Sequence, residues 1–260
     1  MTVLTLLVKG SSSAQLKMVG DLLRAEFENL EVESKVLGEP VNKWVQVSLS
    51  GEDEVIATNY LKKEIGTCPT NLEKVENFSC LKGYITGLDL AKNELVVDVG
   101  IFEPKIALAA IPLGALQTQL VDGKQVQLKK IAEIFGLQED LPLTVKLVDS
   151  TINEDRRLKA ELSKVQIDRF HVWRQSLLDR LIVLGAAEGE ILSVLERTKL
   201  NRDVIDVERL GLFEYALTCK LGTDAAGLIP RIGRYMRYAG FAVFSPRRVN
   251  GLIGELPLAL

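Results

Sequence analysis

The stretch KGYITGLDL (82–90) opens a series of five strand-like runs that decides the fold of the central third of this chain. In the second run Leu95, Val97 and Val99 alternate with Glu94, Val96 and Asp98, and this period of two is typical of a strand. A stripe of apolar residues at helical spacing lies over 122–137, between the third and fourth runs. Five strands with an inserted helix predict a closed barrel of the OB type over residues 78–164. The runs are KGYITGLDL (82–90), ELVVDVGI (94–101), PKIALAAIP (104–112), PLTVKLVDS (142–150) and RRLKAELS (156–163).

Two segments with similar element order flank the barrel. Residues 1–70 predict a β-α-β-β-α domain, and its fourth strand is expected from around Phe78 to Cys80. Residues 179–250 predict a complete β-α-β-β-α-β domain, the order of a ferredoxin-like (split β-α-β) fold. A connector helix over 165–178 and a tail over 251–260 complete an α+β chain, in which the barrel is expected to act as a spacer between two ferredoxin-like domains.

Composition limits the classes of function. The formal net charge is −3, with 26% charged and 47% hydrophobic residues. A protein that wraps bare nucleic acid is more often basic, so an RNA-binding role must rest on local patches. The three cysteines lack paired metal-site spacing, and we expect reduced, mostly buried thiols. No stretch approaches the roughly 18 apolar residues needed to cross a bilayer, and we expect a cytoplasmic protein without a membrane partner.

The first candidate binding cluster lies in the barrel. Phosphate contacts from Arg and Lys supply most non-specific affinity for nucleic acids, and aromatic rings can stack on bases. The alternative is a solvated turn after Asp155 beside ordinary core aromatics. The candidate residues are Lys82, Tyr84, Phe102, Lys105, Arg156, Arg157 and Lys159.

The second candidate cluster lies near the C-terminus, where arginines and tyrosines alternate. A helix expected over 223–240 would place residues three apart on one broad face. Arginine beside tyrosine suits phosphate and stacking contacts, while a solvated helix face or docking on an acidic protein are the alternatives. The candidates are Arg231, Arg234, Tyr235, Arg237, Arg247 and Arg248.

No residue pattern carries catalysis. His171 is the only histidine, and beside Phe170 and Trp173 it is expected to be a packing residue. The glycine-rich turn 222–227 lacks the pattern of a phosphate-binding loop, and Asp224 is expected to cap a helix there. Without a nucleophile motif or metal-ligand spacing, we expect no enzyme activity, no metal, no cofactor and no small-molecule substrate.

Two family resemblances add to this interpretation. The runs KGYITGL, VVDVG (96–100) and VKLVD…EDRRLKAELS (145–163) resemble the OB domain of ribosomal protein S one and its relatives. The runs VERLGLFE (207–214) and CKLGTDAAGLIP (219–230) resemble the archaeal family known only as domain of unknown function twenty-one-ten. That family implies no established activity. The chain departs from the RNA-binding OB pattern at Val96 and over 106–111, where stacking platforms worth about 1–3 kcal/mol per base are missing.

The sequence therefore predicts a non-catalytic accessory factor that binds RNA or a ribonucleoprotein, with the ribosome and the translation apparatus as the first partner class. The basic last strand of the barrel and the C-terminal arginines are the expected points of contact. The alternative is a protein-interaction module associated with RNA polymerase or another information-processing complex, without direct RNA binding.

Overall fold

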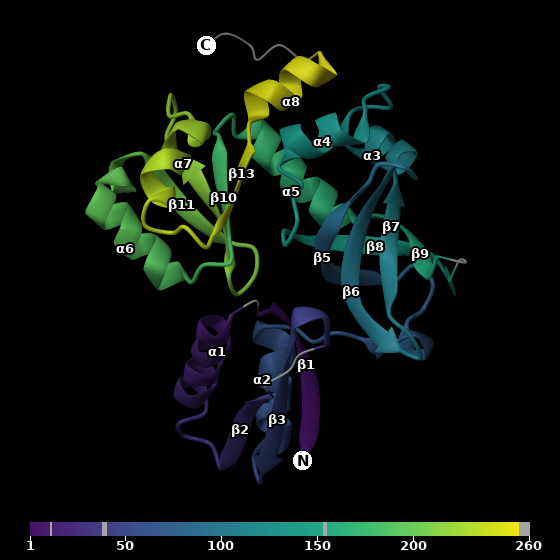
Figure 1. The fold of residues 1–260 in the computed structure, drawn as a ribbon, viewed down its shortest axis with the longest axis vertical. Coiled ribbons are helices and arrows are strands. Elements are labelled where there is room, and N and C mark those ends of the chain that lie inside the picture. The colour runs from purple at the N-terminus through teal and green to yellow at the C-terminus, as the bar shows by residue number, and fades with distance from the viewer. Residues whose placement is uncertain (11, 38–40, 153–154, 255–260) are drawn as a thin grey trace. The chain divides into compact units, whose positions relative to one another are not determined.

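The first strands of the chain form an antiparallel sheet in the order β1-β3-β2, and two helices cover one of its faces (Figure 1). Along β3 the buried side chains of Val45, Val47 and Leu49 alternate with half-buried polar residues, because successive side chains of a strand point to opposite faces. The computed structural model describes residues 1–10, 12–37, 41–152 and 155–254. The elements of this region are β1 (Thr2–Lys9), α1 (Ser13–Glu26), β2 (Val32–Leu37), η1 (Val41–Lys43), β3 (Trp44–Gly51), α2 (Glu54–Glu64), β4 (Thr70–Asn71) and η2 (Leu72–Lys74).

The expected fourth strand of this sheet is wrong. Cys80 begins β5 of the barrel instead. On the edge of β1 away from β3, the described residues form a short antiparallel bridge between Leu6 and Thr67, where the backbone N–H of Cys68 donates to the carbonyl of Thr5 at 2.8 Å. The free edge of β1 is thus partly covered by residues that follow α2 directly.

Five strands close into the barrel predicted from the strand-like runs. β5 pairs with β6 and β8, β8 pairs with β9, and β7 closes the circle by pairing with β9 in parallel and with β6. The mixed α+β class and the five-stranded barrel are therefore confirmed. The strands are β5 (Cys80–Asp89), β6 (Glu94–Glu103), β7 (Ala107–Pro112), β8 (Pro142–Ile152) and β9 (Arg157–Leu162).

Two helices, rather than the one expected, lie between the third and fourth barrel strands. α3 (Leu113–Leu120) directly follows β7, and α4 (Leu128–Phe135) holds the apolar stripe seen in the sequence. Gly136 ends α4 with a left-handed φ of 68°, a conformation that glycine adopts without steric cost. We did not predict α3 because it starts immediately after the strand, without a polar turn.

The C-terminal region forms a four-stranded antiparallel sheet in the order β11-β12-β10-β13. The predicted β-α-β-β-α-β order is observed, and a further helix, α8, replaces the start of the expected tail. Figure 1 shows α6 and α7 on one side of this sheet and α5 on the other. The elements are α5 (Lys164–Gln175), β10 (Arg180–Leu184), α6 (Glu188–Thr198), η3 (Leu200–Arg202), β11 (Val204–Arg209), β12 (Glu214–Cys219), α7 (Ala225–Gly233), β13 (Gly240–Phe244) and α8 (Pro246–Ile253).

An aromatic cluster joins the barrel region to this sheet. Phe244 of β13 is 0% exposed and stacks on Phe170 of α5, with ring centroids 6.1 Å apart and planes at 11°. Trp173 of α5 and Phe135 of α4 meet Phe244 edge to face, at centroid distances of 5.2 and 5.9 Å. Such pairs stabilise a fold beyond their burial alone. The α5 face of the sheet is therefore a packed interior.

The chain forms two compact units, Met1–Val75 with Val99–Ala107, and Glu76–Asp98 with Leu108–Leu260. Most of the barrel thus shares a unit with the C-terminal sheet. The barrel was expected to hold the two flanking domains apart. For the C-terminal domain this expectation is wrong, because the aromatic cluster packs α4 and α5 of the barrel region directly on the C-terminal sheet. No helix among the described residues is long and apolar enough to span a membrane.

Removing the ring at the centre of this cluster should destabilise the second unit. We expect Phe244→Ala to lower the free energy of unfolding by about 3–5 kcal/mol, because it removes buried apolar surface and leaves a cavity. Urea denaturation followed by tryptophan fluorescence measures the change. Val172→Ala, on the exposed face of α5, is the control and should change stability by less than about 0.5 kcal/mol.

Candidate nucleic-acid interface

The C-terminal ends of α6 and α7 lie side by side and gather basic side chains on the surface. Cations are favoured at the last turn of a helix, where the carbonyl ends of the backbone dipoles accumulate. The two helices contact each other, and η3 continues directly from α6. All members are exposed. We call this the α6–α7 basic surface, and it consists of Arg197, Lys199, Arg202, Arg231, Arg234 and Tyr235.

Two contacts tie this surface together. The guanidinium of Arg197 lies over the ring of Tyr235, 4.7 Å from its centroid, in a cation–π contact. The guanidinium of Arg231 donates to the carbonyl of Thr198 at 3.2 Å and lies 3.7 Å from the carboxylate of Asp203. Tyr235 keeps 48% of its surface exposed, so the ring combines a positioned cation with accessible aromatic surface.

The expected helical face of Arg231, Arg234 and Arg237 is wrong. α7 ends at Gly233, so that Arg231 lies in its last turn, Arg234 is the C-cap and Arg237 lies beyond it. Pro230 lies inside α7, where it lacks the N–H that would bond to the preceding turn. The structure brings Arg231, Arg234 and Tyr235 together near the end of α7 but leaves Arg237 outside the helix.

The last two predicted arginines lie on another element. Arg247 and Arg248 belong to the first turn of α8, which packs on α5 and α4. Both are exposed, and Arg248 forms an ion pair with Glu133 of α4. The ion pair of Arg248 holds α8 on α4. Because α8 packs mainly on α5 and α4, we do not count Arg247 and Arg248 in the α6–α7 basic surface.

Lys82 and Tyr84 do not form an open binding face. Tyr84 is 0% exposed, and its hydroxyl donates to the Glu214 carboxylate at 3.2 Å. The ammonium of Lys82 donates to the carbonyl of Leu210 at 2.6 Å. Both side chains of β5 thus bind the β11–β12 hairpin, and Tyr84 has no surface on which a base could stack. The stacking role predicted for it is wrong.

Glu214 is the charged group around which this contact is built. It is 3% exposed, and burial raises the pKa of its carboxyl to about 7, against the hydrogen bonds from Tyr84 and the Phe213 N–H. Burial also lowers the pKa of the Lys82 ammonium, and the nearby carboxylate of Glu214 partly offsets this decrease. Gly211 makes room for the carboxylate, since a Cβ there would lie 2.0 Å from its Oε2.

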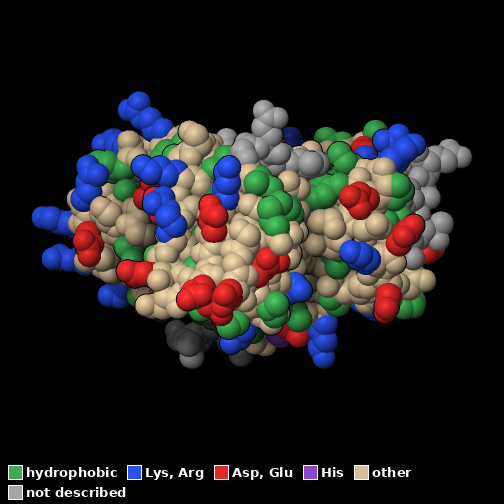
Figure 2. Space-filling model, turned by 90° about the horizontal axis from the view of Figure 1, so that it is seen from below, with side chains coloured by type: hydrophobic (Ala, Val, Ile, Leu, Met, Phe, Trp, Pro, Cys, Tyr) green, Lys and Arg blue, Asp and Glu red, His purple; other side chains and the backbone are tan. Residues whose placement is uncertain are grey.

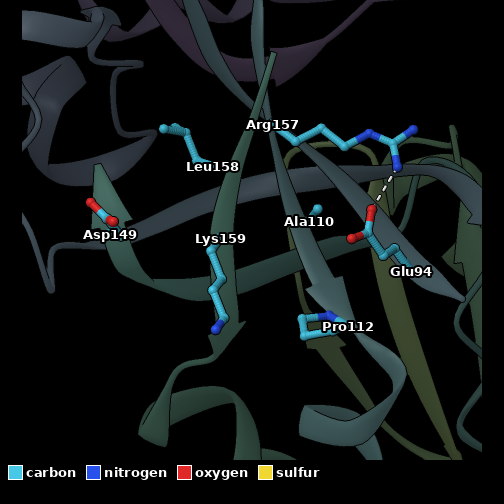
Figure 3. A pocket seen from close by; sticks show the side chains of 7 residues that line it. All are labelled: Glu94, Ala110, Pro112, Asp149, Arg157, Leu158 and Lys159. Atoms are coloured by element: carbon cyan, nitrogen blue, oxygen red, sulfur yellow. Dashed lines mark hydrogen bonds and ion pairs between the residues drawn. The ribbon is translucent and has the colours of Figure 1, made fainter. Parts of the chain in front are cut away.

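Arg157 lines a cavity of about 260 Å³ on the barrel, but its charge is already compensated. Its guanidinium lies 2.8 Å from the Asp89 carboxylate and 2.6 Å from that of Glu94. The hydrogen bond from Arg157 holds the pKa of the Asp89 carboxyl below its usual value. Figure 3 shows Arg157 reaching toward Glu94 while Lys159 extends in another direction. The cavity therefore offers an anion little beyond the exposed Lys159.

The other barrel candidates fall in different parts of the structure. Phe102 is half-buried and Lys105 exposed, and both belong to the first compact unit. Arg156 is exposed and belongs to the second unit. Val96, where a binding member of the OB group would carry an aromatic, is buried on β6. The predicted barrel cluster is thus dispersed.

Other sequence expectations have mixed outcomes. Asp224 caps α7, accepting a hydrogen bond from the Ala226 N–H at 3.1 Å, as predicted. His171 is exposed on α5, with its Nε2 2.8 Å from the side-chain nitrogen of Gln175, so the packing role predicted for it is wrong. Among the described residues, no group of His, Cys, Asp and Glu comes together in metal-binding geometry.

Surface charge agrees with the nearly neutral composition. On the face shown in Figure 2, basic and acidic side chains are interspersed, and the basic ones are most frequent toward the left edge of the view. A binding surface for phosphates must therefore be local.

Family models match almost the whole chain. Residues 1–71 match the DUF2110 N-terminal domain, 75–174 the DUF2110 central domain and 178–244 the DUF2110 C-terminal domain. The chain belongs to the DUF2110 family. No curated protein matches this DUF2110 chain.

Three members of the α6–α7 basic surface of this DUF2110 protein were not predicted from the sequence. Arg197, Lys199 and Arg202 lie about 30 residues before the arginines of α7 in the chain. The run ERTKLNR (196–202) has a net positive charge and follows an apolar helical pattern. This charge could have identified the three residues as candidates. Only the packing of α6 against α7 shows that the two basic segments form one surface.

The buried carboxyl of Glu214 predicts a pH dependence of stability for the DUF2110 protein. Its folded-state pKa of about 7 lies above the ordinary 4.5, so the folded state keeps a proton that the unfolded state loses between these values. Stability from this group is therefore complete below pH 4.5 and falls as pH rises to about 7, by on the order of 3 kcal/mol.

Glu214→Gln should remove this dependence, because the amide stays neutral while its oxygen still accepts hydrogen bonds. We expect the variant to be more stable than wild type at pH 8 and similar to it at pH 4.5, in urea denaturation across this pH range. Glu139→Gln, an exposed residue, should follow the wild-type profile. If the difference in stability between wild type and Glu214→Gln stays constant with pH, the assignment of the pH dependence to Glu214 is contradicted.

Proposed function

We propose that this DUF2110 protein is a non-catalytic RNA-binding factor that contacts RNA phosphates and an unstacked base through the α6–α7 basic surface. The translation apparatus is the first partner class. The observation that carries the proposal is the cation–π pair of Arg197 and Tyr235 within a set of exposed cations from two helix ends. Arginine and aromatic side chains together supply the phosphate and stacking contacts of RNA recognition.

The strand orders support a finer description of the fold. Numbered within the barrel, the pairing order is 1-2-3-5-4-1 with helices before the fourth strand, and we infer a Greek-key barrel of the OB type. The C-terminal order 2-3-1-4, with all neighbours antiparallel, supports a ferredoxin-like domain. The N-terminal order 1-3-2 supports the same fold with its fourth strand reduced to a bridge.

Two other surfaces, of kinds that bind RNA in related folds, are less suited to an RNA contact in this protein. The face of the C-terminal sheet away from α6 and α7 is closed by Trp173, Phe170 and the other members of the aromatic cluster. On the barrel, Tyr84 is buried and Arg157 is compensated by two carboxylates. Among the described residues, in contrast, Arg234 has no carboxylate within 4.0 Å, so its charge is available to a phosphate.

Three exposed arginines of the surface provide the main test. We expect Arg197→Ala, Arg202→Ala and Arg234→Ala together to lower the affinity for structured RNA at low salt by about tenfold or more, because three phosphate contacts are lost. The slope of log affinity against log salt should fall in magnitude by about 2. Fluorescence anisotropy of labelled RNA over a salt series measures both quantities.

The matched control removes three charges elsewhere. Lys17, Lys62 and Lys129 are exposed on α1, α2 and α4, and their joint change to alanine should leave the affinity and the salt slope unchanged. An equal loss in both triple variants would contradict the assigned surface. Absence of RNA binding by wild type at low salt would contradict the function and favour a protein-interaction module of RNA polymerase or another complex, for which ribonuclease-resistant partners in a pull-down are expected.

Tyr235 separates stacking from charge. We expect Tyr235→Ala to weaken binding of single-stranded RNA by about tenfold and to leave duplex binding nearly unchanged, since only unstacked bases can pack on a ring. Tyr235→Phe keeps the ring and should bind as wild type. Equal effects on single-stranded and duplex RNA would show that the ring acts only by holding Arg197, measured in the same anisotropy assay.

A further inference from the structure

The strand β2 leaves one edge of the N-terminal sheet without a partner strand among the described residues. It stands at the end of the order β1-β3-β2 and pairs only with β3. An edge strand presents a row of backbone N–H and C=O groups that can pair with another strand. The far edge of the same sheet, β1, is partly covered by the bridge to Thr67.

β2 has neither a bulge nor a proline on its edge. Its register with β3 runs without a shift from Val32 to Leu37. The edge strand β11 of the C-terminal sheet, by comparison, has an irregularity between Val204 and Asp206, and β1 has one between Thr5 and Lys9. β2 contains no proline, and its one lysine is matched by a glutamate two residues away. A regular edge without a bulge or a proline can pair with another strand where the charges match.

The sequence of β2 is complementary to itself in one antiparallel register. Glu33 and Lys35 are two residues apart, so their side chains share one face of the sheet, and both are exposed. If two copies pair about a two-fold axis at Ser34, Glu33 of each copy lies opposite Lys35 of the other. Directly opposite residues of antiparallel strands have Cβ atoms about 5 Å apart, close enough for an ion pair.

The same register also matches the other face. Val32 of one copy then lies opposite Val36 of the other, on the side where Val36 lies 3.7 Å from the Cβ position of Gly20 of α1. Axes centred on Glu33 or on Lys35 would instead place like charges opposite each other, which destabilises pairing. Of the three axes centred on Glu33, Ser34 or Lys35, the one at Ser34 alone avoids a like-charge pair. A two-fold interface of this kind uses the same surface on both copies.

We propose that β2 pairs with β2 of a second copy of this chain, in the antiparallel register centred on Ser34, to form a continuous six-stranded sheet. Two ion pairs between Glu33 and Lys35 and two valine contacts fix the register. The pairing is short, so the dimer is a reversible one with a dissociation constant in the roughly micromolar range.

Charge exchange tests the register with the full-length chain. Sedimentation velocity over a concentration series should show wild type passing from 28.7 kDa to twice this mass. Glu33→Lys alone and Lys35→Glu alone place like charges opposite each other, and each should raise the dissociation constant about tenfold or more. The double variant Glu33→Lys with Lys35→Glu restores opposite charges and should associate as wild type. Lys62→Glu on α2 is the control for net charge.

Mixing the two single variants gives the sharpest result. A chain with two lysines and a chain with two glutamates are complementary, so the mixture should form a heterodimer although each variant alone is weakened. Circular dichroism and urea midpoints confirm that each variant is folded. The proposal is overturned if wild type stays at 28.7 kDa up to its solubility limit, or if the single variants associate as wild type does.

Discussion

The contact of Phe244 with Phe170 and Trp173 is the interaction on which the second unit depends. It packs α5 and α4 of the barrel region on one face of the C-terminal sheet, while α6 and α7 cover the other. A four-stranded sheet with both faces covered has no open face for a ligand. The interaction that stabilises this unit therefore also closes this face of the sheet.

Burial of charge shapes the second contact between the barrel and the C-terminal hairpin. Lys82 and Glu214 approach each other from different strands, and desolvation shifts the pKa of each toward its neutral form. A buried carboxyl is tolerated because Tyr84 and a backbone N–H donate to it. Such a group costs stability at neutral pH, because burial opposes its ionisation.

The charged groups of this protein fall into two classes with different availability. Arg157 is held by Asp89 and Glu94, and Arg248 by Glu133, so these guanidinium groups stabilise the fold and offer little to a ligand. The ends of α6 and α7 hold cations for a different reason, because the helix dipoles favour them there while leaving them exposed. Local electrostatics thus separates structural from available arginines in a nearly neutral chain.

The amino-acid sequence by itself determined the local pattern: the strand-like runs of the barrel, the cap at Asp224, and the β-α-β-β-α-β order of the C-terminal region. These follow from periodicity and backbone propensity, which act over a few residues. It did not determine which side chains are available. Tyr84 and Lys82 were exposed candidates by pattern, and the three arginines after Ile229 were assigned to one helix face that ends at Gly233. Only tertiary structure decided that Tyr84 meets Glu214 and that Arg197 joins Tyr235, because burial and charge pairing arise between segments that are distant in the chain.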